Sequence, residues 1–205
     1  MPNISARDAL ERLKTGNQLY VDDLRDDSKA PSDSRRRELL AGQKPFAIVL
    51  GCADSRVPTE LVFAQGLGDL FVVRVAGNIA EASQIGSIEF AVLNWDTALV
   101  VVLGHSHCGA IAATLGEMDT PSGTLSPSLT AIVEQIQPGL QELSAADYPD
   151  RNDRLERAVR ANVRVTVEQL GQESAVLRER IESGDLLIVG AEYSLESGQV
   201  TFFDD

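Results

Sequence analysis

The stretch FAIVLGCADSRV, residues 46–57, and its counterpart ALVVVLGHSHCG, residues 98–109, have the same form. Each begins with an uninterrupted apolar run, turns at a glycine and continues into polar residues. A continuous apolar run of this length indicates a strand that is buried on both faces, as in a parallel sheet covered by helices. Because the carboxyl ends of parallel strands meet at one edge of the sheet, the two polar segments are expected to lie close together.

The rest of the chain after residue 45 alternates in the same way. Further apolar runs lie at 70–75 and 186–189, and helix-like stretches lie at 58–65, 84–94, 108–117, 154–170 and 173–182. This alternation predicts an α/β fold with a mostly parallel central sheet flanked by helices. The turn signal Glu196-Ser197-Gly198 predicts a final hairpin that adds an antiparallel edge strand, and residues 118–127, rich in Pro, Ser and Thr, predict a surface loop.

The first 41 residues predict a polar helical arm. Leu10, Leu13 and the Leu19-Tyr20 pair form an intermittent apolar stripe between charged stretches. A segment with Ser28 and Pro31 separates this stripe from a short helix near 35–41, which ends at Gly42. We therefore expect an N-terminal helical arm at 1–41 and an α/β domain at 42–205.

The composition excludes several classes of function. The chain has 205 residues and a formal net charge of -13, which repels nucleic-acid phosphates and anionic membranes. The segment from Met1 to Lys14 has charges where a signal peptide has an apolar core, and no apolar run is long enough to span a bilayer. These features predict a cytoplasmic protein of one domain, with no nucleic-acid or membrane partner.

The cysteines and histidines are few and clustered. The chain has two of each, and both histidines and one cysteine fall between His105 and Cys108. Two thiolates and an imidazole suit Zn²⁺ and can leave a fourth position open for catalysis. If a helix begins after the strand, His105 and Cys108 face one side of it. Cysteines are also common as small buried apolar residues, but the joint pattern favours a zinc site at Cys52, His105 and Cys108.

The neighbouring polar residues have two interpretations each. His107 is expected to face solvent rather than the metal, and is at most a candidate proton carrier because imidazole titrates near neutral pH. Asp54 and Arg56 are either a surface ion pair of little energetic value or a functional pair. In the functional interpretation, Arg56 holds Asp54, which accepts the proton of a metal-bound hydroxide. Asp54 can also move onto the metal and close its open position.

Together these motifs resemble the β-carbonic anhydrases. The resemblance rests on Cys-x-Asp-x-Arg-Val at 52–57 and Gly-His-x-x-Cys-Gly at 104–109, and it extends over 42–116 with a weaker match at 190–193. It implies zinc ligands at Cys52, His105 and Cys108, a catalytic pair of Asp54 and Arg56, and substrate contacts from Gln43, Phe71 and Gly109. In that family the glutamine at the Gln43 position reaches the active site across a dimer interface.

The resemblance also implies the activity and the assembly. A β-carbonic anhydrase converts carbon dioxide reversibly to bicarbonate and a proton with a zinc-bound hydroxide, using one Zn²⁺ per chain. Its minimal unit is a homodimer with swapped N-terminal helices, which in some members associates into a tetramer. Some members have a second, inhibitory bicarbonate site; Arg74 and Tyr193 match two of its positions, but Val49 replaces its tryptophan. Val75 also departs from the asparagine of many members.

Three alternatives remain at this stage. The same ligands serve hydrolases of carbonyl sulfide or carbon disulfide in close relatives, and the motifs do not separate these substrates from carbon dioxide. A structural zinc protein with Asp54 as a permanent fourth ligand would need no turnover, although Arg56 would compete for that carboxylate. A thiol redox protein is disfavoured because Cys52 and Cys108 lack Cys-x-x-Cys spacing.

Overall fold

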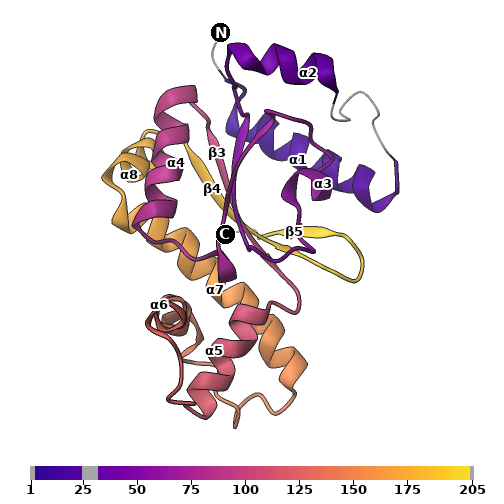
Figure 1. Cartoon of the computed structure of the whole chain (residues 1–205). Helices are drawn as coiled ribbons and strands as arrows, with labels where there is room; N and C mark the ends of the chain where they lie inside the picture. Colours follow the sequence, from indigo (N-terminus) through magenta and orange to yellow (C-terminus); the bar gives the residue numbers. More distant parts are fainter. Residues whose placement is uncertain (1–2, 25–31, 204–205) are drawn as a thin grey trace.

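The computed structural model describes residues 3–24 and 32–203; Ser28 and Pro31 of the polar segment lie outside that range. Within it, five strands form one sheet in the order β2-β1-β3-β4-β5 (Figure 1). They are β1 (Ala47–Gly51), β2 (Leu70–Arg74), β3 (Leu99–His105), β4 (Leu187–Tyr193) and β5 (Val200–Phe202). All neighbouring pairs are parallel except β4 with β5, which is antiparallel. The predicted mostly parallel sheet with an antiparallel edge strand is confirmed.

The two central strands have a core on each face, because every residue of β1 and β3 is buried. Side chains alternate between the faces of a strand, so neighbouring residues enter different cores. Val49 packs with Leu13 and Phe63 on one face, whereas Ile48 packs with Ile88 on the other. Burial on both faces explains why these strands read as continuous apolar runs.

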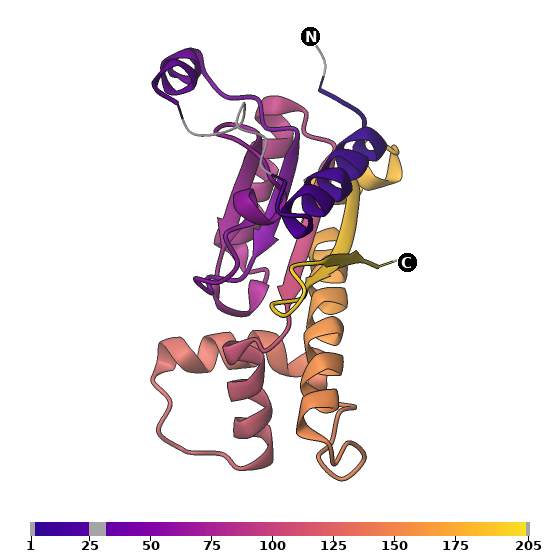
Figure 2. The same ribbon diagram turned by 90° about the vertical axis from the view of Figure 1, so that its right-hand side faces the viewer.

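Helices form the layers on either side of the sheet. Figure 1 shows α1 (Ala6–Val21) and α3 (Thr59–Val62) on one side, with α4 (Ala82–Trp95) and α8 (Ala175–Glu182) on the other. The long helix α7 (Arg151–Glu173) runs along that second side and past the carboxyl ends of the strands, where it meets α5 (Gly109–Asp119) (Figure 2). Helix α6 (Pro127–Ile136) packs against α5. No helix in the described part of the chain has the length and apolar character needed to cross a membrane.

The sequence pattern missed one helix. After the predicted loop, α6 and the 3₁₀ turn Gln137–Leu140 pack against α5 and α7. The signal was present, because Ser126 caps the α6 amino terminus and Pro127 occupies its first turn. Serine and proline are typical of loops, but a serine at the N-cap and a proline in the first turn also favour the start of a helix.

Helix α1 docks on the body of its own chain. Leu13 is fully buried, and the Asn17 side-chain amide donates to the carbonyl oxygens of Val62 (3.0 Å) and Gly198 (2.9 Å). Farther along the predicted arm, α2 (Asp33–Glu38) contributes no buried residue, and Leu40 after it is 84% exposed. The division of the chain at residue 41 and the exchange of arms with a partner therefore stay predictions.

Substituting Gly16 tests the docking of α1. A Cβ at Gly16 would lie 1.9 Å from the Phe63 carbonyl oxygen, so we expect Gly16→Ala to lower the free energy of unfolding by about 1–3 kcal/mol. Gly116 is the matched control, because a Cβ there would have no described atom within 4 Å other than those of its chain neighbours and its own helix backbone. Gly116→Ala should be neutral or stabilise by up to about 1 kcal/mol. Urea unfolding measures both; equal stability of the two variants would contradict this packing.

Candidate metal centre

The carboxyl ends of two adjacent strands bring the predicted ligands together. Cys52 directly follows β1, His105 is the last residue of β3, and Cys108 is the N-cap of α5. All three side chains are buried, and their candidate ligand atoms lie within 4.8 Å of one another. The Sγ atoms of the two cysteines are 4.0 Å apart.

The His105 ring is oriented for coordination. Its Nδ1 lies 2.9 Å from the Ser106 carbonyl oxygen, which can only accept, so Nδ1 carries the proton. Nε2 is then left with a free lone pair, and it is buried without a hydrogen-bond partner among the described residues. An unpaired buried polar atom is costly, and a metal ion is the partner that this nitrogen lacks.

The donor set fits Zn²⁺. Tetrahedral zinc with Zn–S distances of about 2.3 Å places two sulfur ligands roughly 3.8 Å apart, close to the observed 4.0 Å. The Gly77 N–H also donates to Cys52 Sγ at 3.4 Å, which stabilises a thiolate there. Two sulfurs and one imidazole nitrogen are the donor set of a three-ligand catalytic zinc site.

Metal binding at this site depends on the protonation of the three ligand side chains. The hydrogen bond from Cys108 lowers the pKa of the Cys52 thiol to about 4. That same bond, together with burial, raises the pKa of Cys108 well above its usual range. Burial alone would lower the pKa of His105, but its interaction with the neighbouring Cys52 thiolate outweighs this effect and raises the pKa. Without a metal the pair of thiols therefore keeps a proton, which an incoming ion must displace.

Asp54 lies beside the cluster and is held by Arg56. The guanidinium donates from Nε to Oδ1 (2.9 Å) and from Nη2 to Oδ2 (2.7 Å), and the Arg56 backbone N–H also donates to Oδ1 (2.9 Å). These bonds hold the pKa of Asp54 well below its usual range. Asp54 Oδ2 is 3.9 Å from His105 Nε2. The carboxylate is thus fixed beside the metal position while both its oxygens remain engaged by Arg56.

Arg74 fixes the loop that holds the cysteine, a role that sequence reasoning missed. Its Nε donates to the Cys52 carbonyl oxygen (3.0 Å) and its Nη2 donates to the Asp54 carbonyl oxygen (2.6 Å). The family resemblance links Arg74 only to a second bicarbonate site. Tyr193, the other matching position, shares a 3.1 Å hydroxyl hydrogen bond with Tyr20.

The remaining predicted site residues lie in different places. Gly109 begins α5 beside Cys108. His107 has φ 55° and faces Glu196, with Nε2 3.5 Å from Oε1, rather than the metal ligands. Gln43 precedes β1, and Phe71 pairs with Ile48 near the amino end of that strand. Because strands rise about 3.3 Å per residue, these two residues lie roughly 10–15 Å or more along the sheet from Cys52.

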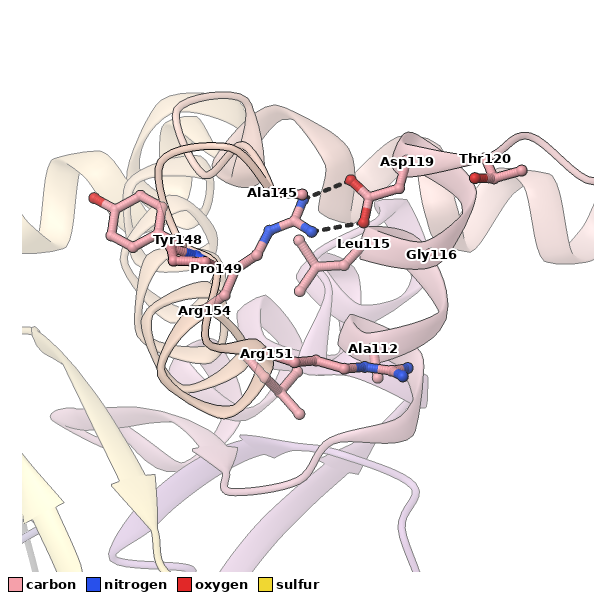
Figure 3. A pocket seen from close by; sticks show the side chains of 11 residues that line it. Ala112, Leu115, Gly116, Asp119, Thr120, Ala145, Tyr148, Pro149, Arg151 and Arg154 are labelled. Atoms are coloured by element: carbon pink, nitrogen blue, oxygen red, sulfur yellow. Dashed lines mark hydrogen bonds and ion pairs between the residues drawn. The ribbon is translucent and has the colours of Figure 1, made fainter.

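Two cavities in the described part of the chain lie away from the cluster. One has a volume of about 380 Å³ and lies between α5 and the start of α7, where Arg154 forms a two-point ion pair with Asp119 (Figure 3). The other, of about 520 Å³, includes Ser106, His107 and Glu192. Neither is lined by a cysteine or by His105, so we place the chemistry at the cluster and assign the Arg154–Asp119 pair to joining α5 with α7.

The fold and the cluster together define an α/β protein with a zinc-type Cys-His-Cys site at the carboxyl end of its sheet. Comparison with known proteins agrees. The family model described as carbonic anhydrase matches residues 47–200. Carbonic anhydrase 2 of Mycobacterium tuberculosis is 41% identical over 205 residues, which cover 100% of this chain and 96% of that protein. The carbonic anhydrase of Mycolicibacterium smegmatis is 40% identical over 98% of this chain and 94% of its own length.

Solved structures show the same architecture. The tetrameric β-carbonic anhydrases of Sordaria macrospora match 83% of this chain and 86% of their own, with a TM-score of 0.73 and 25% sequence identity. The chain belongs to the β-carbonic anhydrase family.

Proposed function

We propose that the chain catalyses the reversible hydration of carbon dioxide to bicarbonate and a proton, with one Zn²⁺ held by Cys52, His105 and Cys108. The observation that carries the proposal is the buried cluster with an unpartnered His105 Nε2, beside the carboxylate that Arg56 holds. Relatives named carbonic anhydrase along the whole chain favour this activity over hydrolysis of sulfur analogues and over a purely structural site.

Each residue of the site has a separate role in the proposed reaction. A zinc ion in this site would supply hydroxide near neutral pH, because it lowers the pKa of a bound water to about 7. Asp54 accepts a hydrogen bond from the attacking oxygen and so keeps a lone pair directed at the substrate carbon. Arg56 holds Asp54 in that orientation and keeps it ionised. Gly109 offers a backbone N–H beside the site, and the buried surroundings of the cysteines exclude bulk water.

Comparing carbon dioxide with carbonyl sulfide tests the choice of substrate. Stopped-flow hydration of carbon dioxide with a pH indicator and release of sulfide from carbonyl sulfide are measured on the same zinc-loaded protein. We expect kcat/KM for carbon dioxide to be at least about tenfold higher. A preference for carbonyl sulfide would overturn the assignment, while zinc binding with neither activity would favour the structural site.

We also propose that the active unit is a homodimer joined along β2. This strand lies at the edge of the sheet, and its Phe71 forms an aromatic cluster with Phe90 and Trp95, whose ring centroids lie 5.4–6.4 Å apart. Phe90 is 51% exposed and Leu93 of the same helix is 59% exposed. An unpaired edge strand beside exposed apolar side chains is typical of an interaction surface. Association of such dimers into tetramers is a further step of the same proposal.

A two-fold axis at β2 would complete the site. Identical edge strands related by such an axis run antiparallel, so the amino end of one β2 lies beside the carboxyl end of the other. Gln43 and Phe71 of one protomer are thereby directed toward the partner's metal centre. This placement supports their assignment to the substrate pocket, although both lie far from the cluster of their own chain.

Mixing two inactive variants tests whether Gln43 acts across the interface. Cys108→Ser removes the metal site, and Gln43→Ala removes the proposed contact. In a mixed dimer one metal site keeps its ligands and receives Gln43 from the other chain, so we expect hydration activity to rise above the sum of the separate variants. If Gln43 serves its own chain, mixing restores nothing. Native mass spectrometry, with one variant isotopically labelled, confirms that subunits have exchanged.

We further propose a cytoplasmic location. The metal centre requires both cysteines as thiolates, and neither forms a disulfide. The cytosol keeps thiols reduced, which supports this location.

A further inference from the structure

Asn162 occupies an unusual place for a polar residue. It lies on the face of α7 that packs against the rest of the chain, with apolar Val159 and Val163 beside it, and it is 1% exposed. Asparagine is a poor helix former, and burying its amide costs free energy unless the amide is hydrogen-bonded. The Asn162 Nδ2 donates to the Gly77 carbonyl oxygen at 2.8 Å. The residue therefore stabilises one particular backbone group.

That backbone group belongs to a residue that contacts a metal ligand. The Gly77 N–H donates to Cys52 Sγ at 3.4 Å. Gly77 has φ 73°, in the left-handed region that favours glycine, and a Cβ there would lie 2.7 Å from Ile136 Cδ1. The Gly77 backbone lies within a tight turn, in which the Asn78 N–H donates to the Val75 carbonyl oxygen (3.1 Å). Within this turn, Asn162 is the side chain that holds the Gly77 carbonyl.

We propose that Asn162 is a positioning residue of the metal centre, acting on the Cys52 thiolate through Gly77. The Gly77 carbonyl and the Gly77 N–H lie in two peptide planes joined at the Gly77 Cα, so holding the carbonyl restrains the backbone torsions of Gly77 and, through them, the direction of its N–H toward the sulfur. An N–H donor withdraws negative charge from a thiolate, so the metal on that thiolate stays more electrophilic. The proposal deepens the proposed function, since it concerns the same zinc site, which α7 would influence through the Gly77 turn.

The test uses zinc affinity and a spectrum rather than turnover. Asn162→Leu keeps the size of the side chain and removes the donor. We expect the Kd for Zn²⁺, from competition with a chromophoric chelator, to rise about 10–100-fold. In Co²⁺-substituted protein, the sulfur-to-metal charge-transfer band is expected to shift from its wild-type position, because the sulfur carries more negative charge.

Asn17→Leu is the matched control. Asn17 is also a buried helical asparagine that donates to backbone carbonyl oxygens, those of Val62 and Gly198, and none of its hydrogen-bond partners is a metal ligand. It should lower stability without moving the zinc Kd or the cobalt band. If Asn162→Leu loses stability but keeps the wild-type Kd and band position, Asn162 is merely structural and the proposal is overturned.

A measurement on the wild type covers the case in which Asn162→Leu does not fold. With ¹¹³Cd in the site, a scalar coupling between the metal and the Gly77 amide proton reports the N–H···S bond directly. We expect that coupling, and its absence would overturn the proposal. Wild-type protein that binds no metal would instead contradict the proposed function itself, so the two failures are distinguishable.

Discussion

Cys108→Ser is expected to abolish tight zinc binding and to lower kcat/KM for carbon dioxide hydration by more than about 100-fold. Changes to residues behind the metal ligands typically cost 10–100-fold, and removing a ligand is expected to cost more. Cys108 is one of two buried sulfurs only 4.0 Å apart, and a serine hydroxyl is a far weaker zinc ligand than a thiolate at neutral pH. Zinc content per chain and stopped-flow hydration are measured on the same preparation.

His107→Ala is the control for this loss. His107 is adjacent to Cys108, but its ring faces Glu196 and it is not part of the buried cluster. This variant should keep one zinc per chain, even if removing a proton carrier lowers the rate. A Cys108→Ser protein with full zinc occupancy and wild-type hydration would show that the metal is held elsewhere.

Asp54→Asn is expected to lower kcat/KM by about 10²–10⁴-fold while one zinc per chain remains bound. The substitution keeps the size of the side chain but removes the charge that Arg56 holds and one acceptor oxygen beside the metal position. Because Asp54 is not one of the clustered ligands, the metal itself should stay. Stopped-flow hydration between about pH 6.5 and 9 provides the rates.

The pH dependence of this effect follows from the lowered pKa of Asp54. A carboxyl with a lowered pKa in the folded protein is ionised above its ordinary pKa of about 3.9, and its stabilising effect is lost only as the pH falls through the lowered value. Asp54 therefore keeps its charge throughout the assay range, and the loss on substitution should be similar at every pH. A loss that appears only at the alkaline end would contradict this assignment.

Asp119→Asn is the matched control. Asp119 also forms a two-point ion pair with an arginine, Arg154, but it lies at the cavity between α5 and α7. Its substitution should leave kcat/KM within about twofold of wild type, because the pair lies away from the clustered ligands and no reacting group is near.

Local sequence patterns predicted the parts of the fold that depend on local chemistry. The continuous apolar residues of β1 and β3 predicted that both faces of these strands are buried, and the glycines at or near the strand ends indicated where the polar loops begin. The convergence of Cys52 with His105 followed from a general property of parallel sheets rather than from a contact visible in the sequence. The clustering of these residues with Cys108 could therefore be predicted from the sequence alone.

Contacts that depend on strand register and long-range packing could not be predicted from the sequence pattern. Arg74 reaches the Cys52 loop because it pairs with Gly51 across the sheet, a register that periodicity does not specify. The apolar spacing of α7 predicted a helix, but it gave no reason for Asn162 on the buried face. Likewise, the stripe of α1 indicated a buried face without revealing that it packs on its own chain.

The measurement that tests the account most directly is a titration of the metal-free wild-type protein with Zn²⁺, followed by stopped-flow carbon dioxide hydration at each step. The account predicts that activity rises in proportion to bound zinc and stops rising at one zinc per chain. Binding of one zinc per chain without hydration activity, up to about pH 9, would contradict it.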